Sequence, residues 1–188
     1  MINYNKLLFA GPFGAGKTTA IRAISNSAPI STETPISTGP EGEKTTTTVA
    51  MDYSFINMEG TTVHVYGMPG QDRLAFMRGI LMEGAIGAIL LLDAAQPSLN
   101  DDLQSWLKSL AALSPGTPIV IGVTKTELAP PSFSLNSLRQ LVSTVSVTSP
   151  VLSIDAREKE DIQQLIRMIL VLSETEFEAG IEKTLGYI

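Results

Sequence analysis

Residues 11–18 read Gly-Pro-Phe-Gly-Ala-Gly-Lys-Thr and fit the pattern G-x-x-x-x-G-K-[ST]. Its glycines permit the positive φ angles that turn consecutive backbone N–H groups toward one anion. In this pattern Lys17 reaches the β and γ phosphates of a nucleotide, and the hydroxyl of Thr18 binds Mg²⁺. An apolar run at 6–10 precedes the loop and a helical pattern at 18–27 follows it, in the required order. These residues predict a polyphosphate site rather than an unliganded glycine-rich turn.

The composition narrows the class of protein. The chain has 188 residues, of which 44% are hydrophobic, so we expect one globular domain over 1–188. The longest apolar run, 85–92, is too short to span a bilayer, and no signal peptide is visible, so we expect a cytoplasmic protein. The absence of cysteine and the single His64 exclude disulfides, thiolate chemistry and a histidine cluster. A net charge of −6 argues against nucleic-acid binding.

Apolar runs alternate with helical patterns along the chain. Strands are expected at 6–10, 49–58, 61–66, 87–92, 118–123 and 151–154. Helices are expected at 18–27, 74–82, 98–113, 134–145 and from Asp155 onward, where apolar residues recur every three or four positions. Ser134 and Asp155 are the expected caps of the last two helices. The apolar stripe Phe177, Ile181, Leu185 and Ile188 follows residue 174, so we expect the last helix to continue there and dock. We therefore predict an α/β P-loop NTPase fold with one doubly wound, mostly parallel six-stranded sheet. The turn at 57–60 makes the second strand an antiparallel edge strand.

The segment 28–48 is rich in Pro, Gly, Ser and Thr and shows no periodicity. A loop of this length in a compact domain is typically functional or disordered. Its position after the first helix suits a loop that closes over a nucleotide, although a tolerated surface insertion is the alternative. It ends in Lys44 and four threonines, which either begin a strand or supply a hydroxyl to Mg²⁺.

Four loops follow strands, at 11–18, 67–73, 124–127 and 155–157. Ligands of open parallel sheets bind at the carboxyl ends of the strands. We therefore expect these loops to converge on one site.

The motifs in these loops resemble those of the small Ras-like GTPases over essentially the whole chain. The spacing of Thr48 and Gly70 is that of the two switch motifs in Arf-like members. The segments 11–19, 44–52 and 68–71 resemble a bacterial branch that contains the Mgl-type polarity GTPases and the conservon GTP-binding proteins. Members of this branch often pair with Roadblock/LC7 proteins.

The resemblance implies a GTP-binding switch that uses Mg²⁺ and slowly hydrolyses GTP to GDP. Gln71 would orient the attacking water, Lys17 and Thr48 would complete the catalytic set, and Thr18 and Thr48 would bind Mg²⁺. Arg73 or Arg78 would be the candidates for an arginine acting in cis on the γ phosphate.

An effector or activating protein would bind the switches and the helix with Phe76 and Met77. The implied nucleotide contacts come from Gly11, Gly14, Ala15, Gly16, Lys17, Thr18, Thr19, Gly70, Thr124, Lys125, Glu127 and Ala156.

Three positions depart from the family pattern. Gly67 replaces the carboxylate of D-x-x-G, for which Asp52 or Asp93 is the possible substitute. The guanine-binding N-K-x-D appears as 124–127, Thr-Lys-Thr-Glu, which keeps a carboxylate on a longer side chain. The chain has Asp155, Ala156 and Arg157 where the family pattern has S-A-K. The contact implied there is made by the backbone N–H of Ala156 to O6 of guanine, and the two side-chain differences leave that N–H in place.

These departures keep two alternatives to the switch open. One is a pseudo-GTPase that binds a nucleotide or a partner without hydrolysis, suggested by Gly67 and Glu127. The other is an ATP-using P-loop enzyme, although the Pro-rich, uncharged segment 128–134 lacks the arginines of a kinase lid.

Overall fold

A computed structural model describes residues 5–25, 30–32, 35–36, 47–48, 51–58, 60–71, 74–145 and 149–185. Side chains are described for 5–25, 52–58, 60–71, 74–145 and 149–174.

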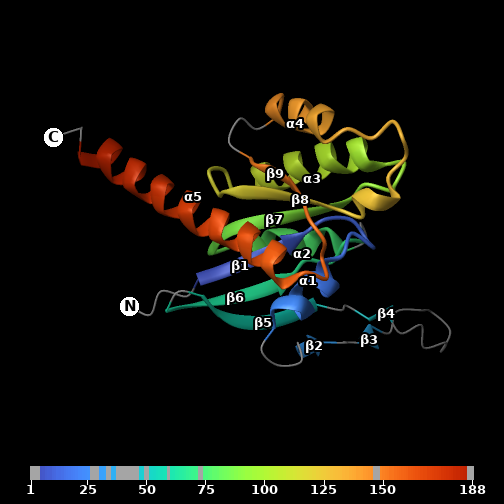
Figure 1. The fold of residues 1–188 in the computed structure, drawn as a ribbon. Helices are drawn as coiled ribbons and strands as arrows, with labels where there is room; N and C mark the ends of the chain where they lie inside the picture. The colour runs from blue at the N-terminus through green and yellow to red at the C-terminus, as the bar shows by residue number, and fades with distance from the viewer. Residues whose placement is uncertain are drawn as a thin grey trace.

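One twisted sheet with the order β2-β5-β6-β1-β7-β8-β9 forms the centre of the molecule (Figure 1). Five neighbouring strands are parallel: β6 (Thr61–Gly67), β1 (Asn5–Ala10), β7 (Ala85–Asp93), β8 (Ile119–Thr124) and β9 (Val151–Ser153). Strand β5 (Met51–Met58) is antiparallel to β6, with Ile56 opposite Val63. The central strands β7 and β8 are buried on both faces, which explains why they read as continuous apolar runs.

The predicted α/β fold with a doubly wound, mostly parallel sheet is confirmed. All six expected strands are present, and a seventh, β2 (Ile30–Thr32), lies outside β5 and pairs antiparallel with it. The segment 28–48 therefore contains short strands where we expected only a loop, since β3 (Pro35–Ile36) also pairs with β4 (Thr47–Thr48). Strand β2 covers part of an edge that would otherwise expose the unpaired backbone groups of β5.

Helices cover both faces of the sheet (Figure 1). Their bounds are α1 Lys17–Ile24, α2 Phe76–Met82, α3 Leu99–Leu113, α4 Leu135–Ser143 and α5 Lys159–Leu185, and a short 3₁₀ turn, η2, spans Thr126–Leu128. As expected, Ser134 caps α4, because its Oγ accepts a hydrogen bond from the backbone N–H of Ser137. Our prediction that Asp155 caps the last helix is wrong: α5 begins at Lys159, and the carboxylate of Asp155 bonds Arg157 instead.

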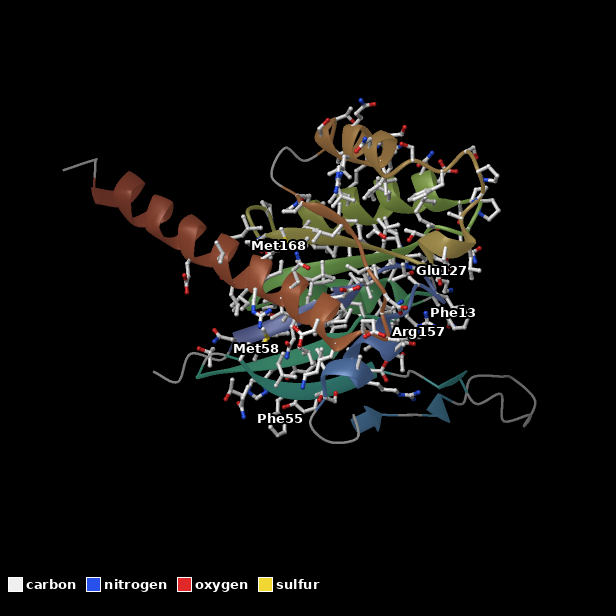
Figure 2. All side chains as sticks on the ribbon, in the orientation of Figure 1. Phe13, Phe55, Met58, Glu127, Arg157 and Met168 are labelled. Carbon is white, nitrogen blue, oxygen red and sulfur yellow. The ribbon has the colours of Figure 1, made fainter. Side chains whose placement is uncertain are left out.

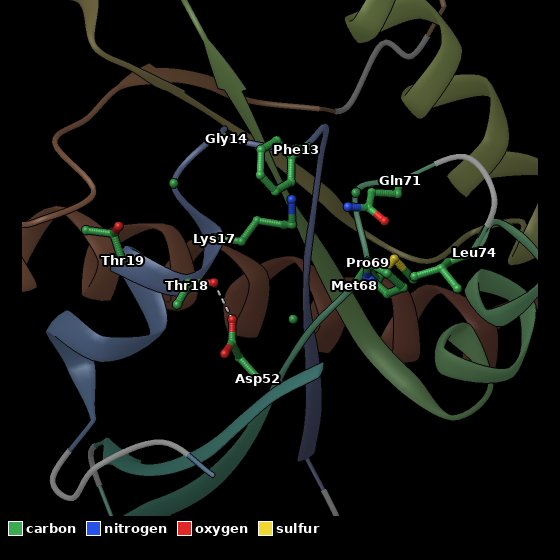
Figure 3. Close-up of a pocket in the computed structure, with 13 residues that line it drawn as sticks. Phe13, Gly14, Lys17, Thr18, Thr19, Asp52, Met68, Pro69, Gln71 and Leu74 are labelled. Atoms are coloured by element: carbon green, nitrogen blue, oxygen red, sulfur yellow. Dashed lines mark hydrogen bonds between the residues drawn. The ribbon is translucent and has the colours of Figure 1, made fainter. Parts of the chain in front are cut away.

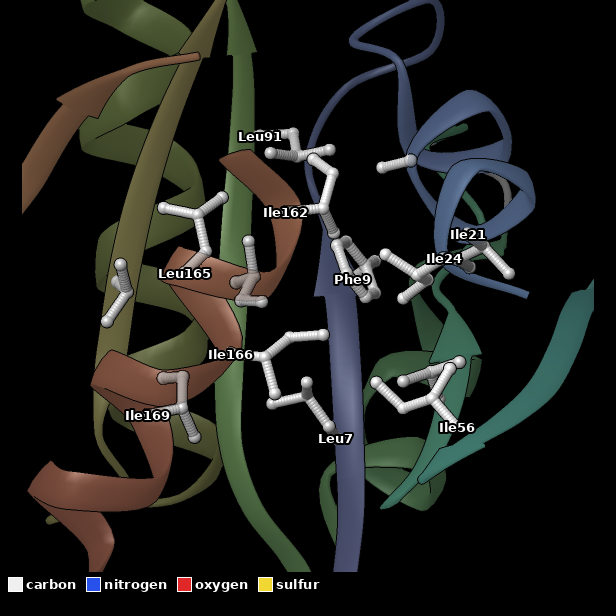
Figure 4. Packing of buried hydrophobic residues seen from close by; sticks show 14 of the residues in the cluster. Leu7, Phe9, Ile21, Ile24, Ile56, Leu91, Ile162, Leu165, Ile166 and Ile169 are labelled. Atoms are coloured by element: carbon white, nitrogen blue, oxygen red, sulfur yellow. The ribbon is translucent and has the colours of Figure 1, made fainter. Parts of the chain in front are cut away.

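Two apolar layers hold these helices on the sheet. On one face, α1 and α5 pack over β1 and β7 (Figure 4); the buried residues there include Leu7, Phe9, Ile21, Ile24, Leu91, Ile162, Leu165, Ile166 and Ile169. The opposite layer lies under α2, α3 and α4 and includes Leu8, Leu90, Leu92, Leu103, Trp106, Leu107, Leu110, Leu138 and Val142. Alternate residues of β1 enter opposite layers, as the two-residue repeat of a strand requires.

Helix α5 approaches β7 closely because Gly87 has no side chain. A Cβ atom at Gly87 would lie 2.3 Å from Cγ2 of Ile169, which is fully buried. Ile169 is β-branched and has little freedom to rotate away. The C-terminal half of α5 extends beyond the sheet (Figure 1). The apolar stripe that we expected to dock there, Phe177, Ile181, Leu185 and Ile188, lies outside the described side chains.

We predict that Gly87→Ala lowers the free energy of unfolding by about 1–3 kcal/mol, because the new methyl group overlaps Ile169. Ile169→Ala alone is expected to cost about 2–5 kcal/mol through the cavity it leaves. The double variant should lose less than the sum of the two, since each change relieves the defect of the other. Urea unfolding measures all three values, and strict additivity would contradict this account of the α5–β7 contact.

Candidate functional site

The glycine-rich loop 11–16 connects β1 to α1 at the carboxyl edge of the sheet. Gly11, Gly14 and Gly16 have φ values of 132°, 82° and 98°. A Cβ atom at Gly11 would lie 2.1 Å from the carbonyl oxygen of Leu91 in β7, so this position accepts only glycine. The loop is therefore held directly against the backbone of the neighbouring strand.

Lys17, the first residue of α1, folds back over this loop. Its Nζ donates hydrogen bonds to the carbonyl oxygens of Gly11 at 2.8 Å and Pro12 at 2.7 Å. Burial lowers the pKa of Lys17 to about 8, against an opposing effect of the Asp52 carboxylate, and the positive charge of Arg78 lowers it further. The ammonium group is thus desolvated and aimed at the loop.

Thr18 and Asp52 meet across the gap between α1 and β5. The Thr18 hydroxyl donates a short hydrogen bond to Oδ2 of Asp52, which is 8% exposed (Figure 3). A Cβ atom at Gly67 would lie 3.3 Å from Cβ of Asp52 and 3.6 Å from its Oδ2. The Asp52 carboxylate therefore occupies the space beside Gly67 into which a side chain at position 67 would project.

The turn after β6 lies against the phosphate loop. Met68 N–H donates to the Phe9 carbonyl at 2.7 Å, and a Cβ atom at Gly70 would lie 2.5 Å from the backbone nitrogen of Phe13. Gln71 follows and lines a cavity of about 300 Å³ (Figure 3). The residues that line this cavity are Phe13, Gly14, Gly16, Lys17, Thr18, Thr19, Asp52, Gly67, Met68, Pro69, Gly70, Gln71 and Leu74.

A second cavity, of about 250 Å³, adjoins the first. It is lined by Gly16, Thr19, Thr124, Lys125, Glu127, Leu128, Asp155, Ala156 and Arg157. Gly16 and Thr19 line both cavities, so the two lie side by side around the start of α1. Glu127 and Arg157 lie at the same end of the molecule as Phe13, opposite Met58 (Figure 2).

Thr124 and Lys125 attach this second cavity to the phosphate loop. The buried hydroxyl of Thr124 lies 3.2 Å from the carbonyl oxygen of Ala15 and 3.1 Å from that of Leu92. Lys125, with φ 55°, donates from Nζ to the Gly14 carbonyl at 3.1 Å and to Asp93 Oδ2 at 2.5 Å. Burial acts to raise the pKa of Asp93, but hydrogen bonds from Lys125 and from the Ala95 N–H outweigh it and lower that pKa. The Thr124 hydroxyl thus holds the phosphate loop against this cavity, which Thr124 also lines.

The four expected loops therefore converge, but several predicted residues take other roles or cannot be placed. Arg78 is 8% exposed, and its Cζ lies 3.9 Å from the ring centroid of Trp106. Arg73 and the side chain of Thr48 lie outside the described residues. Of the two possible substitutes for a carboxylate at position 67, Asp93 bonds Lys125 and only Asp52 reaches Thr18.

Sequence reasoning missed two features of the site. Phe13 is 80% exposed although it lines the first cavity, and the loop pattern carries no signal for the residue at that position. Arg157 bonds the carboxylate of Asp155 two residues earlier, with Nε 2.8 Å from Oδ1. The two-residue spacing of Asp155 and Arg157 could have predicted part of this contact, because an aspartate carboxylate often accepts a hydrogen bond from the backbone N–H two residues later.

Two comparisons with known proteins bear on this site. Residues 37–175 match the family described as conserved hypothetical ATP binding protein. The chain belongs to this family. The match begins after the phosphate loop, so the family assignment and the motif at 11–18 are separate observations that agree on a nucleotide-binding P-loop protein.

A curated relative is also similar to part of this chain. The uncharacterized protein MJ1339 of Methanocaldococcus jannaschii is 32% identical over 81 residues, which is 43% of this chain and 51% of the relative. The chain thus spans about half the length of the curated relative it matches. Within the described residues, no helix is long and apolar enough to cross a membrane, and no three His, Cys, Asp or Glu residues form a metal-binding group.

We predict that nucleoside diphosphate affinity decreases about fourfold from pH 7 to pH 8.5, because Lys17 with a pKa near 8 loses its proton over this range in the free protein. Isothermal titration calorimetry at several pH values measures the effect. Lys17→Arg is the matched control, since a guanidinium keeps its charge throughout. If the variant shows the same decrease as the natural protein, Lys17 is not the titrating group.

Proposed function

We propose that this protein is a GTP-binding molecular switch that uses Mg²⁺, slowly hydrolyses GTP and thereby controls a partner protein. We further propose that residues 1–188 form one such domain and that it acts in the cytoplasm.

The observation that carries the proposal is that the two cavities adjoin at Gly16 and Thr19. One contains Lys17, Thr18 and Gln71, and the other contains Glu127 and Ala156. A mononucleotide bound with its phosphates in the first would extend its base into the second, since Gly16 and Thr19 line both. Strand order, loop geometry and cavity thus support a single nucleotide site.

The phosphate half has the groups that phosphoryl transfer needs, which are mainly positioning groups and positive charge. The N–H groups of 14–18 and the Lys17 ammonium would hold the phosphates, and the Gly70 N–H would contact the γ phosphate. Gln71 would orient the attacking water. Gly70 already packs on the backbone of 12–13, so a γ phosphate there would act directly on the turn at 67–71.

The residues present also fit a magnesium ion. Thr18 and Thr48 would hold it through their hydroxyls, and Asp52 would support it through water. Mg²⁺ needs few protein ligands because phosphates and waters complete its shell, which agrees with a site that has no carboxylate cluster among the described residues. When bound, the ion would neutralise charge on the β and γ phosphates. The hydrogen bond from Thr18 to Asp52 supports this assignment, because it places a carboxylate beside the hydroxyl that would bind the metal.

Guanine is the base that the second cavity suits better. A carboxylate at Glu127 would accept the N1–H and N2–H of guanine, and the Ala156 N–H would donate to O6. Adenine has an acceptor at N1, which would leave the carboxylate facing a lone pair. The description of the family nevertheless names ATP, so an ATP-using P-loop protein is the second candidate.

The partner would bind the face formed by the switch segments and α2. Phe76 and Ile80 on this helix are 70% and 69% exposed, one turn apart. An effector or activating protein, of Roadblock/LC7 type by the resemblance, is our proposal for the occupant of this face.

We expect the purified protein to release phosphate from GTP in the presence of Mg²⁺, and at least tenfold more slowly from ATP. Gln71→Leu should keep nucleotide binding and reduce hydrolysis about 10²-fold or more, because the water loses its orienting group. A phosphate-release assay with both nucleotides, with Lys17→Ala as the inactive control, measures this. Faster release from ATP would favour the ATP-using candidate, and no release from either nucleotide, even with a cognate partner, would refute the hydrolase.

We expect Asp52→Asn to raise the Mg²⁺ concentration needed for half-maximal GTP binding about tenfold, because the charge beside Thr18 is lost. At saturating Mg²⁺ the variant should bind normally. Asp93→Asn is the matched control, because it neutralises another buried carboxylate that bonds Lys125 instead. Titration of Mg²⁺ against a fluorescent GTP analogue gives both midpoints, and equal shifts in the two variants would remove the special role of Asp52.

A further inference from the structure

Helix α2 has a buried arginine that the mechanism proposed above does not use. Arg78 is 8% exposed, and together with Leu81 and Met82 it forms the buried side of this helix. Taking a guanidinium out of water is costly, and an apolar side chain of similar size would fill the same space without that cost. An arginine at this position therefore indicates a role beyond filling space.

Trp106 in α3 is the platform on which this charge rests. The Cζ atom of Arg78 lies 3.9 Å from the centroid of the Trp106 ring, so the guanidinium lies over the face of the indole. Trp106 is itself 5% exposed. Cation–π attraction is strongest with tryptophan and increases when water is excluded from both groups. The planar guanidinium also stacks on a ring, which the ammonium group of a lysine does not do.

Helix α2 depends on such contacts for its position. It has seven residues, which is too few for a helix to be stable by itself. Its C-terminal end is held by Lys6, whose Nζ donates to the carbonyl oxygen of Glu83 at 2.8 Å. At the other end, the N-cap residue Ala75 makes no side-chain hydrogen bond, and the first turn contains no acidic residue. Arg78 is the first buried residue within α2, so its contact with α3 is the one that steadies this half of the helix.

Backbone hydrogen bonds connect Arg78 to the turn that contains Gln71. The Arg78 N–H donates to the Ala75 carbonyl at 3.0 Å, and the Leu74 N–H donates to the Gln71 carbonyl at 3.0 Å. Leu74 is 5% exposed and lines the phosphate cavity on the same side as Gln71 (Figure 3). A displacement of Arg78 from Trp106 would therefore be passed on to Leu74 and Gln71.

We propose that Arg78 is a positioning residue for hydrolysis, which lies on Trp106, holds α2 against α3 and thereby keeps Gln71 at the phosphate cavity. Arg78 then acts through Gln71 and does not contact the γ phosphate itself, unlike the arginine in cis that the resemblance implied. This inference rests on the proposed GTP hydrolysis.

Single-turnover hydrolysis of GTP at pH 7, measured beside GTP affinity, tests the proposal. Arg78→Met keeps a long apolar side chain and removes the guanidinium. We expect it to slow hydrolysis about tenfold and to change GTP affinity by less than about twofold, because orientation of the attacking water matters in the transition state and not in the bound ground state. Arg78→Lys should restore hydrolysis only in part, since it keeps the charge without the planar group.

Two controls separate this effect from a general loss of charge or of stability. Arg22→Met removes an exposed arginine from α1 and should hydrolyse GTP at the natural rate. Ile169→Ala weakens the apolar layer on the opposite face of the sheet and should also leave the rate unchanged.

A second measurement does not depend on hydrolysis. In the nucleotide-free protein, Arg78→Met should increase hydrogen exchange at the Leu74 amide about tenfold, because the bond from Leu74 to Gln71 opens more often. Trp106→Leu should reproduce both the slower hydrolysis and the faster exchange. The double variant should be no worse than either single variant, since both remove the same contact.

Each outcome bears on one of the two proposals. If Arg78→Met hydrolyses GTP at the natural rate, loses affinity as much as rate, or leaves exchange at Leu74 unchanged, the role of Arg78 is refuted while the GTPase stands. If exchange at Leu74 increases but the natural protein releases no phosphate from GTP, the hydrolase is refuted. Arg78 is then an anchor of α2 only, and its role in positioning Gln71 for hydrolysis is refuted as well.

Discussion

The close backbone contact between the phosphate loop and its two neighbours is the constraint on which the site depends. On one side Gly11 lies against the carbonyl of Leu91, where a Cβ atom would come within 2.1 Å of the oxygen. On the other side Gly70 lies against the backbone of Phe13. No side chain separates these segments, so a shift of the turn at 67–71 is transmitted to the loop by direct contact. A site built this way would respond to small displacements, which supports the phosphate-operated switch that we propose.

The same close packing explains how the Asp52 carboxylate in β5 can occupy the space beside position 67 in β6. Strands β5 and β6 are hydrogen-bonded neighbours, and the Asp52 side chain lies in the space beside α1 toward which a Cβ atom at position 67 would also point. Only one of the two positions can carry a large side chain, because a Cβ atom at 67 would already lie 3.2 Å from Cδ1 of Ile21. Asp52 uses the space that Gly67 leaves open. A glycine at position 67 is therefore compatible with the magnesium site that we propose, in which Asp52 supplies the carboxylate.

The sequence was sufficient for the fold because its strongest signals are local. The continuous apolar runs of β7 and β8, the strand–loop–helix order around 11–18 and the periodicity of α3 each follow from neighbouring residues. The bonds of the site were harder to predict, because they join residues far apart in sequence, such as Thr18 with Asp52 and Thr124 with Ala15. Arg78 shows the same limit: its stacking on Trp106 depends on how α2 and α3 pack, which no local pattern encodes.

The two halves of the site carry different information about the nucleotide. The phosphate half, built from 11–18, Asp52 and 67–71, contacts groups that ATP and GTP share, so it is equally consistent with the family's description as ATP binding. We propose that base choice depends on the second cavity, where an acceptor at Glu127 and a donor at Ala156 would match the edge of guanine and oppose that of adenine. Hydrogen bonds to a charged group contribute about 1.5–3 kcal/mol each, which is enough for this cavity to decide between the two bases.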